Sequence, residues 1–197
     1  MKLHDLTAAV IVLAWILLIV FLGAVGRRFK ATPKAARHVS RVGFVLQGLA
    51  YALVFIGTGT RTSVPLGAAT PLDVTVTVIV VLLAFASLAF GVWAARALGA
   101  QWSLTARMIE GHELVVSGPY RIVRHPIYLA MLGMLWATAL AFSGPLMLVM
   151  GTAVYFVGTM VRIRSEDALL RETFGAEFEA YRERVPALLP RLSRFRF

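Results

Sequence analysis

Cysteine is absent from this chain of 197 residues, which excludes disulfides, thiolate metal sites and cysteine nucleophiles. Charge is also scarce: 15% of the residues are charged, whereas a soluble domain has about a quarter. Hydrophobic residues make up 59% of the chain. Because the apolar residues form long runs and do not follow an amphipathic period, the composition predicts a membrane protein.

Five apolar runs are long enough, or nearly so, to cross a bilayer as helices. Three are close to the ~20 residues that a crossing needs, whereas the last two have 16 residues each and are short for a full span. Ser143-Gly144-Pro145 separates the last two, which we predict to form a helical hairpin. The predicted fold is an all-α integral membrane protein with about five transmembrane helices, a C-terminal hairpin and a cytoplasmic helical tail. The runs are Leu6 to Val25, Val42 to Thr60, Val74 to Ala95, Ile127 to Phe142 and Leu146 to Val161.

The basic residues gather on one side of this predicted arrangement. With the N-terminus outside and five crossings, all of the 20 Lys and Arg except Lys2 and Arg61 fall on the same side. The positive-inside rule assigns that side to the cytoplasm, so we expect a multi-pass protein of the cell (inner) membrane with a cytoplasmic C-terminus. The net charge of +10 then reflects topology, and no nucleic-acid partner is expected because no nucleic-acid motif accompanies it. Ala24-Val25-Gly26 loosely resembles a signal-peptide cleavage site, but basic residues follow the first run and do not precede it, so we expect a retained span.

Two regions follow from these runs: residues 1–98, with three spans and a basic loop, and residues 99–197, with a motif loop, the hairpin 127–161 and the C-terminal helices. Small residues recur every fourth position on spans three and four, which favours close helix packing. In the motif loop, we expect a short extended stretch at 114–116 between two turns. Pro126 suits the first position of a helix, so His125 lies near the N-cap, where the positive helix end favours an anionic ligand group. The small residues are Ser87, Gly91, Ala95 and Gly99, then Gly133, Ala137 and Ala141.

The tail carries an apolar stripe at helical spacing and an acidic pair. The stripe predicts an amphipathic helical face, with Gly175 ending one helix before the next. The acidic pair, Glu166 and Asp167, lies within two turns of the end of the fifth run. Either the pair binds a ligand, or it forms ion pairs at helical spacing with nearby arginines. The stripe is Leu170, Phe174, Phe178, Tyr181 and Val185, and the arginines are Arg162, Arg164 and Arg171.

Three segments of the second half resemble the isoprenylcysteine carboxyl methyltransferase family, whose wider group includes the phospholipid N-methyltransferases. The segments are Leu98 to Ser103, Glu110 to Tyr120 and Arg124-His125-Pro126-Ile127-Tyr128. The tail is similar as well, in its acidic pair, Phe174-Gly175 and Val185-Pro186. The similarity covers about residues 96–190.

This resemblance implies a small membrane enzyme that uses S-adenosyl-L-methionine (SAM) in a cytoplasmic pocket between the Arg-His-Pro segment and the C-terminal helices. It implies catalytic roles for Arg124, His125 and Glu166. The cofactor pocket would include Val115, Val116, Gly118, Tyr120, His125, Pro126, Tyr128, Glu166 and Asp167. The chain departs from the family at Asp167, where Glu is usual, and at Phe178, where Tyr is usual. The first change shortens one carboxylate, and the second removes a hydroxyl.

The methyl acceptor stays open at this point. Arg121 and Arg124 provide forked donors for a carboxylate, and we expect Trp102, Arg121 and Tyr181 to line the acceptor site. A carboxylate acceptor is ionised at neutral pH, whereas an amine or a thiol must lose a proton to a base such as His125 or Glu166. The residues therefore predict methylation of an isoprenylcysteine-type carboxylate, with a phospholipid amine or a small thiol as alternatives. A membrane scaffold that retains the fold without the reaction is the non-enzymatic alternative. The sequence predicts no metal and leaves the oligomeric state open.

Overall fold

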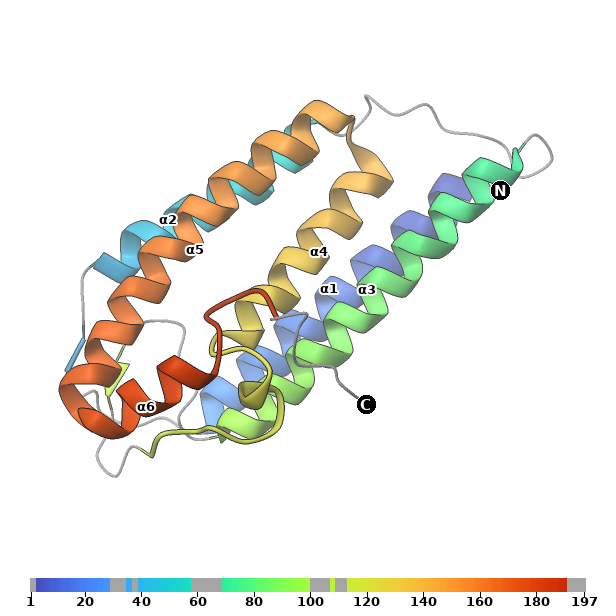
Figure 1. The fold of residues 1–197 in the computed structure, drawn as a ribbon. Coiled ribbons are helices and arrows are strands. Elements are labelled where there is room, and N and C mark those ends of the chain that lie inside the picture. The colour runs from blue at the N-terminus through green and yellow to red at the C-terminus, as the bar shows by residue number, and fades with distance from the viewer. Residues whose placement is uncertain are drawn as a thin grey trace.

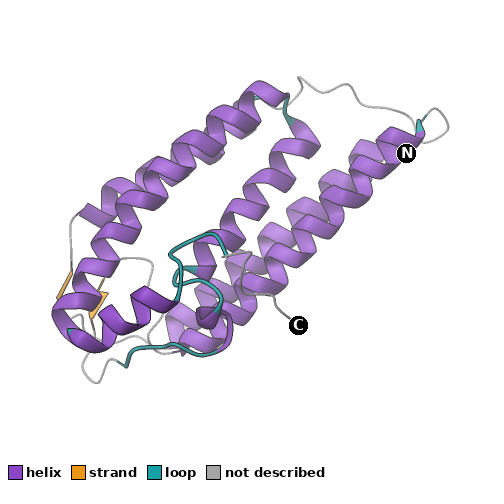
Figure 2. Cartoon of the chain, in the orientation of Figure 1, coloured by secondary structure: helices purple, strands orange, loops and turns teal. Residues whose placement is uncertain are grey.

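A computed structural model describes residues 3–28, 35–36, 39–57, 69–99, 107–108 and 113–190. Helices dominate this part of the chain, as predicted, and two strands of two residues each pair antiparallel, with Ala35 opposite Met108. Figures 1 and 2 show the helices as a long bundle with a short helix, α6, folded across one end. The elements are α1 (Leu3–Arg28), β1 (Ala35–Ala36), α2 (Val39–Ile56), α3 (Pro71–Leu98), β2 (Arg107–Met108), η3 (a 3₁₀ turn, Gly118–Arg121), α4 (Pro126–Phe142), α5 (Pro145–Phe174) and α6 (Ala176–Arg184).

The five long helices alternate in direction along the bundle (Figure 1). The ends of α1, α3 and α5 and the starts of α2 and α4 therefore lie at the same end as α6. The β1–β2 pair links the α1–α2 connection to the α3–α4 connection there. This alternation is what the five-run prediction requires, and the side of the membrane on which this end lies stays a prediction.

Helix α4 is the centre of the bundle. It contacts α1, α2, α3 and α5, whereas α2 packs mainly on α5, and α1 on α3. Most of its residues are buried, and its apolar side chains belong to two separate core clusters. Met134 packs with α1 and α3, and Leu135 packs with α2 and α5. A helix that is apolar all round is expected to be buried on every side.

The predicted stripes of small residues on spans three and four face each other. Ser87, Gly91 and Ala95 of α3 are buried, and so are Gly133, Ala137 and Ala141 of α4. A Cβ added at Gly91 would lie 3.2 Å from the Cβ of Ala130, and one added at Gly133 would overlap the side chain of Ser87. Gly99 ends α3 with a φ of +51° and is not part of the packed face.

A second close approach, between α2 and α5, was not predicted. A Cβ added at Gly43 would lie 2.6 Å from the carbonyl oxygen of Gly158, and one added at Gly158 would lie 2.9 Å from that of Gly43. Two helical turns away on α5, a Cβ added at Gly151 would lie 2.8 Å from Cγ2 of Val54. The sequence carries the signal as a seven-residue spacing of small residues: Gly43 and Ala50 on α2 with Gly57 just after it, and Gly151 and Gly158 on α5 with Gly144 at its N-cap.

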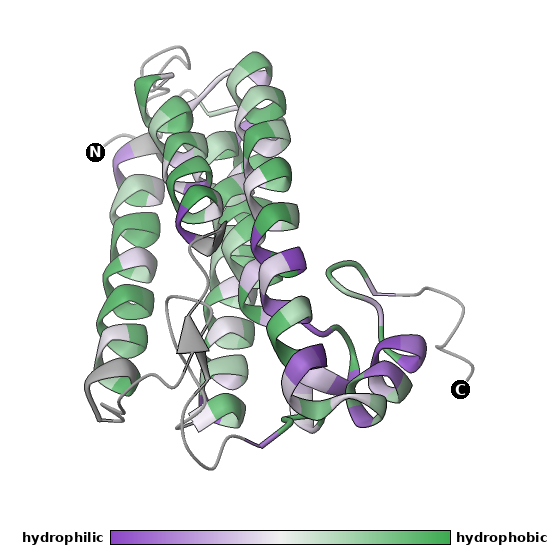
Figure 3. Ribbon diagram, turned by 90° about the vertical axis from the view of Figure 1, so that its left-hand side faces the viewer, coloured by the Kyte–Doolittle hydropathy of each residue, from purple (hydrophilic) through white to green (hydrophobic). Residues whose placement is uncertain are grey.

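Helix α5 is longer than the predicted hairpin arm. The prediction ended it at Val161, but the helix continues without interruption to Phe174. The reason is that a change from apolar to charged residues does not stop a helix, and no Gly or Pro occurs between Val161 and Gly175. Gly175 then ends it, as predicted, with a φ of +51° that favours glycine, and α6 begins at Ala176. The polar end of α5 therefore extends past the apolar bundle toward α6 (Figure 3).

Three helices have the length and composition to cross a membrane: α1, α3 and α5. Helices α2 and α4 are apolar but shorter, with 18 and 17 residues. Large apolar side chains are exposed along the outer faces of the bundle, as expected for contact with lipid. The apolar colouring in Figure 3 covers the bundle, and hydrophilic residues gather at the end with α6. The chain is thus a membrane protein with five apolar helices.

Two other expectations about local structure have mixed outcomes. Pro126 occupies the first position of α4 and His125 its N-cap, as predicted, although the His125 side chain makes no capping hydrogen bond. The stretch 114–116 belongs to no strand and leads into η3. Trp102 lies outside the described residues.

Replacing Gly158 with Ala tests the close approach of α2 and α5. The new Cβ would lie 2.8 Å from the Cβ of Leu46 and 2.9 Å from the Gly43 carbonyl oxygen, so the helices must move apart. We expect a loss of about 1–3 kcal/mol in the free energy of unfolding, measured by thermal unfolding in detergent. Gly23→Ala is the matched control, because nothing lies within 4 Å of its added Cβ. An equal effect of the two substitutions would contradict the packing.

Candidate active site

Two segments far apart in the sequence meet at the α6 end of the bundle. One is the start of α4 with the residues before it, 124–128, and the other is the polar end of α5, 162–167. Pro126 stops the backbone from continuing as helix before it, so the chain crosses the end of α5 at Arg124 and His125. The segment after α6 runs beside this crossing: the backbone N–H of Arg124 donates to the Pro186 carbonyl at 2.8 Å, and that of His125 donates to the Ala187 carbonyl at 3.0 Å.

Arg124 binds both α5 and the segment after α6. Its Nη2 donates to Asp167 Oδ2 at 2.8 Å, and its Nη1 donates to the carbonyls of Val185 at 2.6 Å and Arg182 at 3.3 Å. The last carbonyls of a helix are the groups that lack an intrahelical partner, so Arg124 caps the end of α6. Its side chain is 8% exposed, and its Nε has no hydrogen-bond partner among the residues that the structure describes.

His125 lies between the two carboxylates of the acidic pair. Its Nε2 is 2.9 Å from Asp167 Oδ1, and its Nδ1 is 3.4 Å from Glu166 Oε2. Its ring is stacked on that of Tyr128, with the ring centres 5.7 Å apart. Burial opposes the charged form, but hydrogen bonds to Asp167 and Glu166 outweigh it and raise the pKa of His125 above its usual value.

Tyr128 and Arg162 hold the other side of Glu166. The Tyr128 hydroxyl donates to Glu166 Oε1, and Arg162 Nε donates to the Tyr128 hydroxyl oxygen at 2.7 Å. Arg162 Nη2 lies 3.6 Å from Glu166 Oε1, one helical turn away on α5. The Arg162 guanidinium also lies over the Tyr128 ring, 5.0 Å from its centre. The predicted ion pairing at helical spacing is thus confirmed for Glu166, which pairs with Arg162. Asp167 pairs instead with Arg124, which is not on its own helix.

The sequence alone did not single out Arg162 or Gln47 as members of this cluster. Arg162 is 4% exposed and Gln47 is 2% exposed. Arg162 Nη1 donates to Gln47 Oε1 at 3.4 Å, and Gln47 Nε2 donates to Thr159 Oγ1 at 2.9 Å. The available signals were the spacing of Arg162 from Glu166 and the presence of a side-chain amide in an otherwise apolar run. The clustered charges are Arg124, His125, Arg162, Glu166 and Asp167.

The remaining predicted site residues differ in their burial and in their contacts. Tyr120 is buried, and the hydroxyl of Tyr181 donates to its carbonyl oxygen at 2.7 Å. Gly118 adopts a φ of +58° at the start of η3 and packs on Trp93. Arg121, in contrast, lies on the exposed side of η3. Val115 is half-buried and Val116 is exposed, and both precede η3.

The predicted apolar stripe of the tail forms the support beneath the cluster. Phe178, Tyr181 and Val185 are buried together, and Leu170 and Phe174 pack against them across the bend at Gly175. The stripe therefore forms one packed cluster although its residues are divided between α5 and the tail that begins with α6. Phe178 is fully buried among apolar side chains, in keeping with the absence of a hydroxyl at this position. The packing of this stripe fixes where Arg182 and Val185 present their carbonyls to Arg124.

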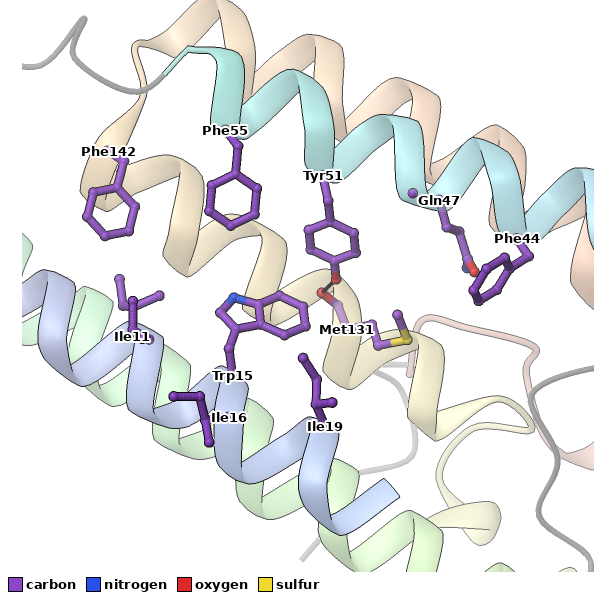
Figure 4. Close-up of a pocket in the computed structure, with 12 residues that line it drawn as sticks. Ile11, Trp15, Ile16, Ile19, Phe44, Gln47, Tyr51, Phe55, Met131 and Phe142 are labelled. Carbon is purple, nitrogen blue, oxygen red and sulfur yellow. Dashed lines mark hydrogen bonds between the residues drawn. The ribbon is translucent and has the colours of Figure 1, made fainter. Parts of the chain in front are cut away.

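An apolar groove begins beside the cluster and runs along the bundle between α1 and α2, with α4 as its floor (Figure 4). Its volume is about 440 Å³, within the range of small-molecule sites. Phe44 and Gln47 lie at one end, and Phe55 and Phe142 lie at the other. Trp15 of α1 lies between them.

Comparison with known proteins gives the chain a family. Residues 74–177 match the phospholipid methyltransferase family model, which is just over half of the chain. The chain is 40% identical to methanethiol S-methyltransferase 2 of Bradyrhizobium diazoefficiens over 84 residues, which are 43% of this chain and 31% of that protein. The chain is also 42% identical to the nickel-cobalt-cadmium resistance protein NccN of Alcaligenes xylosoxydans xylosoxydans over 85 residues, which are 43% of this chain and 39% of that protein.

A third relative is the probable protein-S-isoprenylcysteine O-methyltransferase of Oryza sativa subsp. indica, 38% identical over 83 residues, which are 41% of this chain and 42% of that protein. The matched region thus spans less than half the length of each of these relatives. The ion-pair cluster at 124–128 and 162–167 lies within the residues that match the family model. The chain therefore belongs to the phospholipid methyltransferase family.

Proposed function

We propose that this protein is a membrane methyltransferase that transfers a methyl group from SAM to the carboxylate of a lipophilic thioether of the isoprenylcysteine type, at the cytoplasmic face. The observation that carries the proposal is the buried cluster in which the Arg-His-Pro segment meets the acidic pair. The cluster lies inside the family match, and relatives named as methyltransferases share the family. In-line methyl transfer depends chiefly on positioning two reactants, which suits a site built from rigid helix ends.

The residues of the cluster fit a SAM molecule in charge and in hydrogen bonding. Two buried polar atoms, Arg124 Nε and Ser165 Oγ, have no hydrogen-bond partner within the described part of the chain. Glu166 would receive the ammonium or the ribose hydroxyls, and Arg124 with His125 would face the cofactor carboxylate at the positive end of α4. When bound, SAM supplies an electrophilic methyl group on a sulfonium. Tyr128, Tyr120 and Pro126 would line the adjacent walls.

The protonation state of His125 supports a carboxylate acceptor. Both ring nitrogens face carboxylates, and its raised pKa keeps the ring charged to higher pH than a free histidine. A charged imidazole cannot accept a proton, so it is a poor general base for an amine or a thiol. A carboxylate acceptor needs no base. Methylation of a small thiol is the second candidate, because a methanethiol S-methyltransferase is among the relatives at 40% identity.

Direct methylation tests the proposal. Purified protein in nanodiscs, supplied with SAM carrying a labelled methyl group, is expected to label a prenyl thioether carboxylate in preference to phosphatidylethanolamine or methanethiol. The products are separated and identified by mass spectrometry, and calorimetry measures SAM binding without any acceptor. No SAM binding would overturn the proposal, whereas labelling of methanethiol alone would replace the acceptor class with the thiol.

Glu166→Gln removes a negative charge from the cluster. We expect SAM to bind at least about tenfold more weakly by calorimetry, because losing a hydrogen bond to a charged group costs about 1.5–3 kcal/mol. The matched control is Glu179→Gln, since Glu179 pairs with Arg171 and Arg182 on the exposed α5–α6 corner. Equal SAM affinity for both variants would remove Glu166 from the cofactor site.

The stability contributed by the charge on His125 depends on pH. Because the folded pKa is raised above the unfolded value of about 6.5, this contribution is complete below that value and is lost as pH rises through the folded pKa. The unfolding temperature of the wild type in detergent should therefore exceed that of His125→Gln most at pH 6 and below, and the difference should shrink as the pH is raised. A difference that stays constant between mildly acidic and strongly basic pH would mean that the histidine is not held charged.

A further inference from the structure

The groove and the ion-pair cluster come from different parts of the chain. Nearly all of the groove is lined by residues of α1 and α2, whereas the family match begins at residue 74. The cluster lies at the start of α4, on the residues just before it, and on α5, all inside the match. The walls that would select an apolar molecule therefore lie mostly outside the family match. The machinery beside them is what the chain shares with its family.

Two lining residues connect the groove to the cluster, and both contact Arg162. Phe44 lies under the Arg162 guanidinium, 5.7 Å from the ring centre, and Gln47 accepts a hydrogen bond from its Nη1. In Figure 4, Phe44 and Gln47 stand together at one end of the groove. From Phe44 the groove follows α2 for eleven residues to Phe55, about 16 Å at the helical rise. The apolar groove thus ends at two residues that contact a buried cation, Arg162.

The polar groups within the groove differ in what they bind. Tyr51 donates its hydroxyl to the Met131 carbonyl at 2.7 Å, and Trp15 donates to Thr138 at 3.1 Å. Both bonds tie groove walls to α4. Gln47 instead contacts Arg162 at 3.4 Å, near the outer limit of a hydrogen bond, so this contact yields readily to a stronger acceptor. An anionic oxygen arriving along the groove is such an acceptor.

We propose that Gln47 is the specificity-determining residue for the methyl acceptor: it keeps the groove end uncharged and holds Arg162 in place to receive the anionic head group of an amphiphile whose apolar chain lies in the groove. Gln47 acts through Arg162 and is a positioning residue. This inference rests on the proposed function and deepens it, because it assigns acceptor choice to a residue of α2. Arg162 already pairs with Glu166 at 3.6 Å, and a polar but neutral side chain at position 47 adds no second negative charge beside it. A carboxylate at position 47 would add that charge and repel an incoming anion.

Quenching of tryptophan fluorescence tests the occupant of the groove without any methyl donor. A variant with Trp93, Trp102 and Trp136 replaced by Phe retains Trp15 alone as the reporter in the groove wall. In phosphatidylcholine nanodiscs it is titrated with ω-bromododecanoate, with its neutral methyl ester and with ω-bromododecylammonium. We expect the carboxylate to half-quench Trp15 at the lowest concentration. Equal half-quench concentrations for the three probes, no quenching, or a preference for the ammonium would each overturn the inference.

Substitution of Gln47 in the same background separates positioning from packing. Gln47→Glu should raise the half-quench concentration of the carboxylate probe about tenfold, because like charges repel, and leave that of the methyl ester within about twofold. Tyr51→Phe is the matched control, since it removes a polar group from the same groove without touching Arg162. It should keep the preference for the carboxylate. Unchanged preference in Gln47→Glu, or equal loss in both variants, would contradict the role of Gln47.

Turnover then distinguishes this inference from the proposed function. In Gln47→Glu, the KM for a carboxylate acceptor should rise about tenfold while the KM for SAM and the calorimetric SAM affinity stay at the wild-type values. A retained SAM affinity also shows that the variant is folded. A rise in the KM for SAM would overturn the assignment to the acceptor. A wild-type protein that selects the carboxylate probe but never methylates it would contradict the proposed function alone.

Discussion

The interaction on which the rest of the structure depends is the pairing of two adjacent carboxylates on α5 with two cations at the start of α4. Glu166 and Asp167 share His125, and Arg124 binds Asp167. Taking these charges out of water is expensive, and the pairing offsets that cost only when every partner is in position. The cluster therefore requires α4 and α5 to be held in one register. The tail after α6 adds backbone hydrogen bonds from Arg124 and His125 that hold it there.

Glycine packing supplies that register. The small faces of α3 and α4 meet at Gly91 and Gly133, and those of α2 and α5 meet at Gly43 and Gly158. In lipid, close van der Waals contact takes the place of a hydrophobic driving force between helices, so such faces set where the helices stop sliding. The Gly43–Gly158 approach lies one turn from Arg162. It brings Gln47 of α2 within reach of a cation on α5, and so it connects the apolar groove with the polar cluster.

Much of this was visible in the sequence, and what was missed has a physical cause. The tail stripe from Leu170 to Val185, the helix end at Gly175 and the first helical position of Pro126 were all predicted and confirmed. The end of the last long helix was predicted thirteen residues too early, since charged residues are as compatible with a helix as apolar ones. The sequence offered Arg162 only as one of three arginines, with Arg164 and Arg171, that could pair with the acids at helical spacing, and gave no sign that it is buried. Its burial depends on Gly43 lying opposite, which no local pattern of α5 reveals.

The sequence by itself determined which segments are apolar helices and which charged residues stand beside them, because these properties depend on neighbours along the chain. It also placed Arg124, His125, Glu166 and Asp167 among the functional candidates. Only the tertiary structure decided what each side chain binds. It assigned Arg124 to Asp167 and to the carbonyls at the end of α6, and it joined Gln47 to Arg162 across more than a hundred residues. Those partners depend on which helix faces meet, and that is settled by packing between distant segments.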